Sequence, residues 1–272
     1  MVETFALTGR ALSRVGTARD LAAASAQLPA GAYTTMRTYG RDGVAFLEEH
    51  VRRLEESAGL QGRPGSIDRG RLRAALGQAL AAGGHPESRL RVTFAPPEVF
   101  VSVEPFVPIA EGLYESGVWC VTVPLRRDVP QAKDTRFLAS AQAAYGELPE
   151  GAHEGLIVAE DGAILEGLSS NVFAVVDGVL RTEEARALRG TTRALVLELA
   201  RGVVPVSLEP TSKDDLPRAT EMFLTSVSRA VLAVVKVDEV VIGRGRPGAL
   251  ARELRRRYRA RMKELVERLP PA

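Results

Sequence analysis

Two apolar runs joined by Asp161-Gly162 constrain the fold of this chain more than any other feature of its sequence. Residues 155–160 and 163–166 both have strand character, and Asp-Gly tolerates the positive φ angles that a two-residue hairpin turn demands. An antiparallel strand pair is therefore predicted. The pair ends on Glu166, and the polar residues that follow, up to Asn171, suggest a polar pocket at the strand end; a surface role for this carboxylate is the alternative.

The remaining pattern alternates short strands with helices, which predicts a two-domain chain of the α/β (α+β) class. Strands are expected at residues 32–39, 90–94, 99–107, 118–123, 171–176, 179–182, 221–226 and 231–237. Helices are expected at residues 18–24, with Thr17 as cap, and at 47–60, 68–82, 191–200 and 250–269. Residues 108–116 lack clear periodicity, so we expect a small N-terminal domain at 1–108, a linker at 109–116 and a larger domain at 117–272.

Composition argues against several classes of partner. The 272 residues include 36 basic and 34 acidic side chains, and a net charge of +2 gives no reason to expect nucleic acid or a membrane surface. No apolar run approaches the roughly 20 residues of a membrane helix and no signal pattern begins the chain, so a cytoplasmic enzyme is expected. Scattered histidines and a single cysteine, Cys120, in an apolar run predict no metal site.

Lysine is scarce, and this limits lysine-dependent chemistry to few positions. The chain has four lysines, at positions 133, 213, 236 and 263, and arginine cannot replace lysine in forming a Schiff base. Lys133 stands before an apolar, alanine-rich stretch, and Arg136 could supply positive charge. Burial and such charge lower a lysine pKa from its ordinary value of about 10.4, which favours a nucleophilic amine. A surface lysine is the alternative.

Three further segments could bind an anion. Gly190-Thr191-Thr192 begins a predicted helix, whose free N–H groups suit a phosphate, although a simple helix cap is the alternative. Residues 225–228, Thr-Ser-Val-Ser, place hydroxyl groups at a strand end, where they could bind an anion or cap the turn. Arg53 could point inward from its helix as a phosphate partner or lie on its solvated face.

In their order and spacing these pieces resemble the class IV aminotransferases, which are the fold-type IV pyridoxal 5′-phosphate enzymes. The resemblance runs from about Gly31 to Val237. It implies a small N-terminal α/β domain and a larger domain built on a mixed β-sheet or barrel. It also implies a homodimer whose small-molecule partners are an amino acid and a keto acid.

The resemblance assigns a role to each candidate residue. Lys133 would form the internal aldimine with pyridoxal 5′-phosphate and later transfer the proton, and Glu166 would pair with the pyridine nitrogen. Arg53 would bind the phosphate together with Gly190, Thr191 and Thr192. A further phosphate contact would come from the segment Ser226, Val227 and Ser228. Many relatives have a hydroxyl residue where Val227 stands. In this chain, either Ser226 or Ser228 would supply that hydroxyl group, or the backbone alone would make the contact.

Substrate recognition is less constrained by the motifs. Arg91 and Arg37, on predicted strands of the small domain, are candidates for holding the substrate carboxylate, with exposed strand arginines as the alternative. Branched-chain enzymes of the family have a tyrosine shortly after the lysine, whereas Phe137 and Leu138 stand there in this chain.

The predicted function is amino-group transfer between an amino acid and a 2-keto acid. One alternative is a lyase of the same family that forms p-aminobenzoate and pyruvate from aminodeoxychorismate, because it would use the same lysine and glutamate. A more remote alternative is a binding protein that has lost the cofactor.

Overall fold

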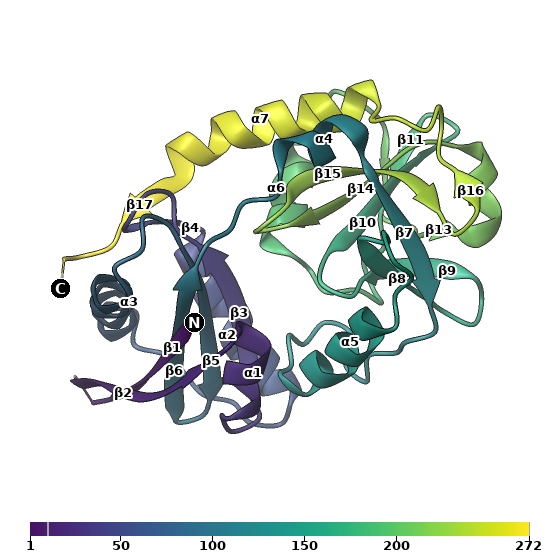
Figure 1. Cartoon of the computed structure of the whole chain (residues 1–272). Helices are drawn as coiled ribbons and strands as arrows, with labels where there is room; N and C mark the ends of the chain where they lie inside the picture. The colour runs from purple at the N-terminus through teal and green to yellow at the C-terminus, as the bar shows by residue number, and fades with distance from the viewer. Residues whose placement is uncertain (10, 272) are drawn as a thin grey trace. The chain divides into compact units, whose positions relative to one another are not determined.

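The chain divides into two compact units in a computed structural model, which describes residues 1–9 and 11–271 (Figure 1). The first unit contains Met1–Val107, Ala132–Ala139 and the C-terminal residues from Met262. The second contains Pro108–Gln131 and Ser140–Arg261. Helices α5 (Arg136–Gly146) and α7 (Ala249–Leu265) have residues in both units.

The first unit is built on an antiparallel sheet of five strands in the order β2-β1-β6-β5-β3. Its elements are β1 (Val2–Thr8), β2 (Ala11–Ala18), α1 (Leu21–Ala26), β3 (Ala32–Arg37), β4 (Gly43–Ala45), α2 (Leu47–Leu60), α3 (Arg69–Gly83), β5 (Ser88–Ala95), β6 (Glu98–Pro105) and β17 (Val266–Arg268). The predicted helix at 47–60 is confirmed, and its apolar stripe of Leu47, Val51, Leu54 and Ala58 is buried. This stripe packs into the core with the buried residues of β5 and β6.

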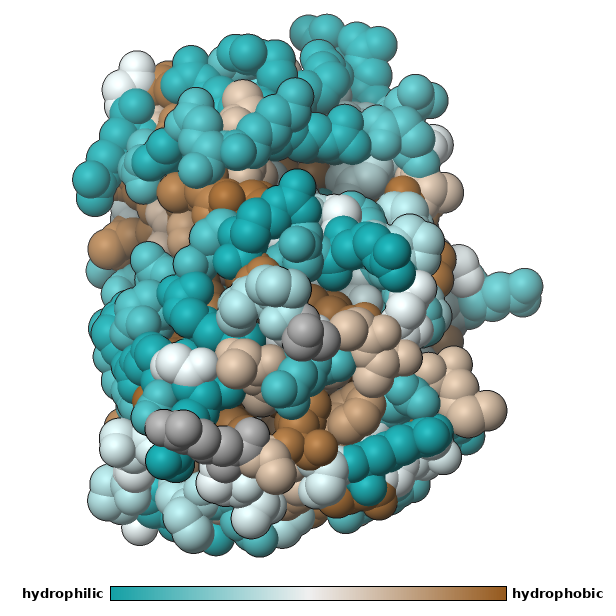
Figure 2. All heavy atoms as spheres, turned by 90° about the vertical axis from the view of Figure 1, so that its left-hand side faces the viewer, coloured by the Kyte–Doolittle hydropathy of each residue, from teal (hydrophilic) through white to brown (hydrophobic). Residues whose placement is uncertain are grey.

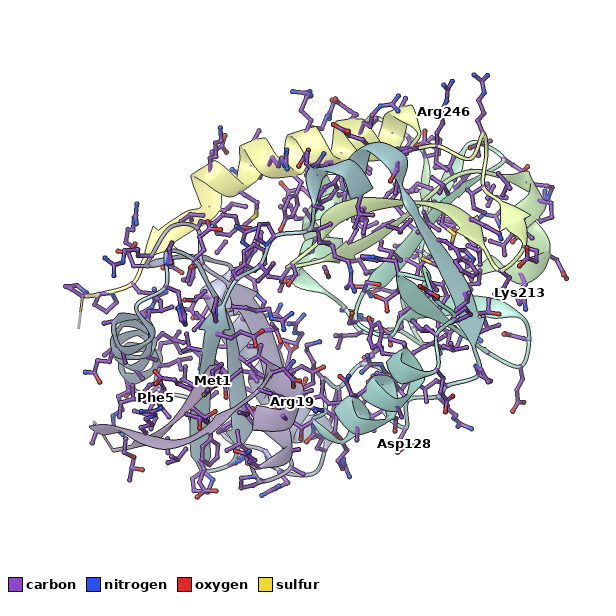
Figure 3. All side chains as sticks on the ribbon, viewed as in Figure 1. Met1, Phe5, Arg19, Asp128, Lys213 and Arg246 are labelled. Carbon is purple, nitrogen blue, oxygen red and sulfur yellow. The ribbon has the colours of Figure 1, made fainter. Side chains whose placement is uncertain are left out.

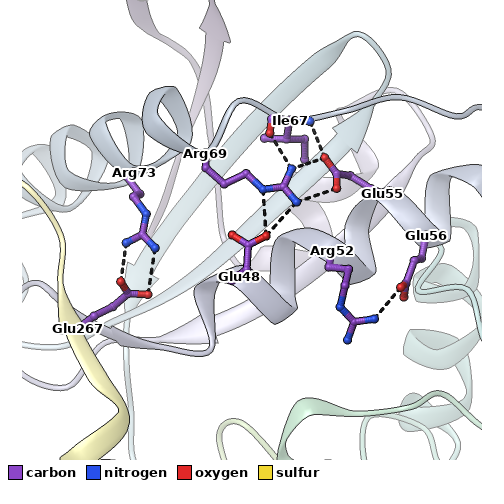
Figure 4. Close-up of polar contacts among 8 residues, drawn as sticks. All are labelled: Glu48, Arg52, Glu55, Glu56, Ile67, Arg69, Arg73 and Glu267. Atoms are coloured by element: carbon purple, nitrogen blue, oxygen red, sulfur yellow. Dashed lines mark hydrogen bonds and ion pairs between the residues drawn. The ribbon is translucent and has the colours of Figure 1, made fainter.

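Ion pairs join the two long helices of this unit (Figure 4). Arg69 at the start of α3 donates to Glu55 and Glu48 of α2, over 2.8 and 3.1 Å. Arg73 contacts Glu267 of β17 over 2.6 Å. Pairs that remain partly open to solvent contribute little stability individually, so the apolar core carries most of the packing energy.

Two local predictions in this unit are wrong, and one hairpin was not predicted. The short helix begins at Leu21 rather than at residue 18, because the Asp20 carboxylate, and not Thr17, caps it by accepting from the Ala23 N–H at 2.8 Å. The hairpin of β1 and β2 was not predicted. The last helix was predicted to reach residue 269 but ends at Leu265, and β17 then pairs with β4. A side chain on Gly43 would lie only 2.6 Å from Val266, so glycine at this position permits the pairing.

The second unit contains a mixed sheet of ten strands, which follow the path β12-β11-β10-β14-β15-β7-β8-β9-β13 with β16 beside β15. Its elements are α4 (Glu111–Ser116), β7 (Val118–Val123), β8 (Glu154–Val158), β9 (Ala163–Gly167), β10 (Asn171–Val176), β11 (Val179–Arg181), α6 (Thr191–Ala200), β12 (Val206–Ser207), β13 (Thr211–Ser212), η1 (Lys213–Arg218), β14 (Ala219–Ser226), β15 (Ala230–Val237) and β16 (Val240–Val241). Strand β7 runs parallel to both β8 and β15, while most other neighbours are antiparallel. Stacked rings of Phe173 and Phe223, 5.1 Å apart, lie fully buried in this unit.

The hairpin predicted around Asp161-Gly162 is confirmed as β8 and β9, with a different turn. The Ala159 N–H donates to Ala163 O over 2.9 Å, so three residues, 160–162, form the loop. Of these, Gly162 alone has a positive φ angle, +80°. A three-residue loop with glycine in the left-handed region is the commonest hairpin connection after the two-residue loops. In the resulting strand pair, Glu166 lies opposite Ile157.

Residues 109–116, expected to form a linker, contain helix α4. Its Tyr114 hydroxyl donates to the Arg229 carbonyl at 2.9 Å, and Glu111 pairs with Arg255 at 2.6 Å. These contacts place the segment within the second unit.

Polar and charged side chains cover much of the face seen in Figure 2, with smaller apolar areas between them. No helix in the described part of the chain is long and apolar enough to cross a membrane.

Candidate functional site

The backbone around Lys133 is attached to the first unit by hydrogen bonds on both sides of the lysine. Its carbonyl accepts from the Tyr33 N–H at 2.8 Å, and its own N–H donates to the Ser57 hydroxyl at 3.1 Å. Thr135 makes two bonds with Gly31, of 2.9 and 3.0 Å. Gly31 is required here because a side chain would lie 2.4 Å from the Phe94 carbonyl oxygen. The lysine therefore starts from a fixed backbone.

The Lys133 amine lies beside aromatic and basic groups. Its Nζ is 4.5 Å from the centre of the Tyr33 ring. Arg136, expected to contribute charge, is exposed and pairs with Asp134 at 2.5 Å. Two buried arginines lie in this region instead: Arg91 lies 4.8 Å from the centre of the same Tyr33 ring, and the charges of Arg53 and Lys133 both act on His50.

The other three lysines have solvent-facing surroundings. Lys213 extends from the surface and lies 3.7 Å from Asp238 (Figure 3). Lys236 pairs with the exposed Glu239 at 3.0 Å, and Lys263 is exposed. Lys133, whose charge acts on the buried His50, is the candidate nucleophile.

Arg53 points inward from α2 and joins two other buried polar side chains. Its Nη2 donates to Thr34 Oγ1 at 2.8 Å and lies 3.3 Å from His50 Nδ1, while Thr34 Oγ1 is 2.7 Å from the same nitrogen. Burial lowers the pKa of Arg53 to about 10, so the guanidinium keeps its charge at neutral pH. Burial, and then the charges of Arg53 and Lys133, lower the pKa of His50 well below its ordinary value. A charged arginine is thus oriented by two neutral groups.

Glu166 is a buried carboxylate of β9 in the second unit, with 3% of its surface exposed. Its Oε1 lies 2.5 Å from Arg127 Nε, and its Oε2 accepts from the Leu188 N–H at 3.1 Å. These partners favour the ionised carboxylate. Arg127 is not predicted from the sequence, because its pairing with Glu166 depends on a loop that no local pattern specifies.

The Gly190-Thr191-Thr192 segment begins α6, as predicted. Gly190 is the N-cap, and a side chain there would lie 2.3 Å from Asn171 Oδ1. Asn171 in turn donates to the Leu188 carbonyl at 2.6 Å. The first amides of a helix have no partner within the helix, so this end offers N–H groups and the Thr192 hydroxyl to an anion.

Residues 225–228 lie where β14 ends and the chain turns toward β15. The Arg229 N–H donates to Ser226 O at 3.2 Å and approaches Ser226 Oγ at 3.3 Å, which closes the turn. Thr225 Oγ1 is buried, and no hydrogen-bond partner for it lies within the described residues. Val227 and Ser228 are half-buried.

The two substrate arginines are engaged within the first unit. Arg91 is 9% exposed and donates to Leu21 O and Ser25 Oγ, both at 2.8 Å. Arg37 pairs with Glu87 at 2.8 Å and stacks on Phe106, 3.8 Å from the ring centre. The alternative that they are ordinary exposed strand arginines is wrong, and a substrate role for either stays a prediction. Among residues 1–9 and 11–271 no cluster of potential metal ligands is found.

Comparison with known proteins identifies the family. The amino-transferase class IV family model matches residues 31–237. The chain belongs to the class IV aminotransferase family. This confirms the predicted family and its activity class, a transaminase, and nothing in the matches favours the lyase.

Individual relatives agree with this assignment. The chain is 27% identical to a Methanocaldococcus jannaschii protein provisionally named a branched-chain-amino-acid aminotransferase, over 84% of this chain and 86% of that protein. It is 27% identical to the D-alanine aminotransferase of Bacillus licheniformis, over 90% and 92% of the two chains. The crystal structure of a Thermotoga maritima protein, provisionally named a branched-chain amino acid aminotransferase, has a TM-score of 0.81 at 26% identity, covering 97% of both chains. The last comparison confirms the predicted fold class.

Proposed function

We propose that this chain is a pyridoxal 5′-phosphate-dependent aminotransferase that moves an amino group between an amino acid and a 2-keto acid. The observation that carries the proposal is the position of Lys133. Its backbone is hydrogen-bonded on both sides, its amine lies beside Tyr33, and its charge acts on His50, which contacts the buried Arg53. The family model spans this residue and every predicted cofactor contact.

The donor groups suit a phosphorylated pyridine. Arg53 is a buried, oriented guanidinium, and the start of α6 offers free amides, so both favour a dianionic phosphate. The buried Thr225 hydroxyl gives the turn at 225–228 a further unused hydroxyl. We assign the phosphate to Arg53, Gly190, Thr191 and Thr192, with Ser226, Val227 or Ser228 completing the set.

When bound, pyridoxal 5′-phosphate supplies an aldehyde that condenses with amines and a ring that accepts the electron pair left by the substrate α-proton. Lys133 would carry the cofactor and then hold or move that proton at Nζ. Glu166, kept ionised by Arg127 and the Leu188 N–H, would accept the hydrogen bond of the ring N–H and keep that nitrogen protonated.

The substrate is proposed from the names of the relatives. Relatives are named for branched-chain amino acids and for D-alanine, so we propose a small, uncharged amino acid and its 2-keto acid as substrates, with Arg91 or Arg37 as the candidate carboxylate partner. We further propose, from the family resemblance, that the enzyme acts as a homodimer in the cytoplasm.

An amino-transfer assay with Lys133→Ala and Lys213→Ala tests the function. Wild-type protein and Lys213→Ala should bind the cofactor, turn yellow and aminate 2-oxoglutarate or pyruvate from a panel of D- and L-amino acids. Lys133→Ala should lose the yellow colour and all transfer, because Lys133 is the residue assigned to carry the cofactor. Colourless wild-type protein that refuses the cofactor would support the binding-protein alternative, and release of p-aminobenzoate without amino transfer would support the lyase.

A further inference from the structure

A cluster of five hydrogen-bonded side chains lies in the second unit beside two segments assigned to the cofactor. Glu154 on β8 is completely buried, and its carboxylate accepts from Tyr145 of α5 and from Ser170, the latter at 3.0 Å. Arg229 lies 3.2 Å from the same carboxylate and donates to Ser169 at 2.9 Å. The Tyr145 hydroxyl is 2.6 Å from Ser169 Oγ, which closes the ring of contacts.

This cluster joins two segments that are distant in sequence. Ser169 and Ser170 follow Glu166, and their loop is folded tightly, since the Gly167 N–H donates to Ser170 O at 2.8 Å. Arg229 ends the turn that begins at Ser226, to which its own N–H donates. The guanidinium of Arg229 therefore ties the loop after Glu166 to the turn at 226–229.

Tyr145 contributes the phenol that completes the cluster. Burial, together with the Glu154 charge, raises the pKa of its phenol, so it stays protonated and donates to the carboxylate. Without this donor, one oxygen of the buried Glu154 carboxylate would lose a hydrogen bond, at a cost in free energy.

We propose that Tyr145 is a positioning residue, whose phenol holds the loop after Glu166 and the turn at 226–229 in the arrangement that binds the cofactor. The effect on cofactor binding rests on the proposed function. The effect on the two segments does not, because their contacts are present in the chain itself.

Amide hydrogen exchange of cofactor-free protein tests the positioning directly. Tyr145→Phe should accelerate exchange of the Gly167 and Arg229 amides together, by roughly tenfold, because one hydrogen bond to a charged group is lost. Thr122→Val is the matched control, since it removes a hydroxyl bond of 2.8 Å to the Asp238 carboxylate in the same unit. It should leave both amides unchanged.

Cofactor affinity gives the second measurement. Tyr145→Phe should raise the dissociation constant for pyridoxal 5′-phosphate roughly tenfold and shift the absorption band of the bound cofactor, while Thr122→Val changes neither. Ser169→Ala should have a similar effect, and combining it with Tyr145→Phe should add little, because both changes open the same contact.

Unchanged exchange at Gly167 and Arg229 in Tyr145→Phe would overturn the inference, as would an effect equal to that of Thr122→Val on every readout. Fully additive effects of Tyr145→Phe and Ser169→Ala would also contradict it. If the wild type binds no cofactor, the proposed function fails, and the exchange measurement still decides whether Tyr145 holds the two segments.

Discussion

At the scale of single residues, two of the proposed cofactor contacts are buried charges that each unit orients before any ligand arrives. Arg53 is held by Thr34 and His50, and Glu166 by Arg127 and the Leu188 N–H. Such prior orientation lowers the entropy lost on binding, but keeping a charge buried costs stability. The variants below separate these two effects.

Removing Glu166 should destabilise the protein mainly because the buried Arg127 loses its ion-pair partner. Glu166→Ala would bury the Arg127 guanidinium without its ion-pair partner, at a cost of about 3–5 kcal/mol. Glu166→Ala combined with Arg127→Met should recover part of this loss. Urea unfolding of the single and double variants checks the expectation; a double variant less stable than Glu166→Ala would contradict it.

Acidification should destabilise the protein through His50. Its folded pKa is well below the ordinary 6.5 because of burial and then of Arg53 and Lys133. Below about pH 6.5 the unfolded chain therefore takes up a proton that the folded protein does not, so stability falls as pH falls, by up to about 1.4 kcal/mol per pH unit. His153, whose pKa is also lowered, adds to this slope.

Unfolding free energies measured between pH 5 and 7 (about the range where histidine titrates) test this assignment. His50→Gln should flatten the pH dependence, and His85→Gln serves as the control. Equal slopes in wild type and His50→Gln would rule out His50 as the source.

At the scale of elements, the start of α6 is fixed by close contact with β10. Gly190→Ala would place a methyl group 2.3 Å from Asn171 Oδ1. We expect a loss of about 1–3 kcal/mol in stability and weaker cofactor binding, because the helix start must shift. Gly59→Ala in α2 is the control: nothing lies within 4 Å of the new methyl group, so a gain of about 0.5–1 kcal/mol is expected. Thermal unfolding and cofactor titration measure both, and an unchanged Gly190→Ala protein would contradict the close contact.

Locally encoded elements were predictable from the sequence, and elements fixed by distant partners were not. Asp161-Gly162 predicts its hairpin, and the apolar stripe of α2 predicts its buried face, because each signal lies within one segment. Strand β17 depends on pairing with β4, far away in the chain, and its sequence continues a helical pattern. Arg127 was missed for the same reason, since its partner Glu166 lies on another element.

At the scale of the whole molecule, cofactor binding should stabilise the fold. A ligand that binds only the folded state at a concentration 100 times its dissociation constant adds about 2.7 kcal/mol. We therefore expect pyridoxal 5′-phosphate to raise the unfolding temperature of the wild type and to leave that of Arg53→Met almost unchanged, because the phosphate loses its buried guanidinium. Scanning calorimetry with inorganic phosphate as a second ligand checks this. An equal rise of the unfolding temperature in Arg53→Met would show that Arg53 does not bind the phosphate.

The identity of the lysine that carries the cofactor is the central claim. Borohydride reduction of the protein incubated with pyridoxal 5′-phosphate, followed by peptide mass spectrometry, makes that linkage permanent and locates it. The phosphopyridoxyl group should appear on the peptide that contains Lys133, in one copy per chain. Its absence, or its attachment to Lys213, Lys236 or Lys263 instead, would contradict the assignment.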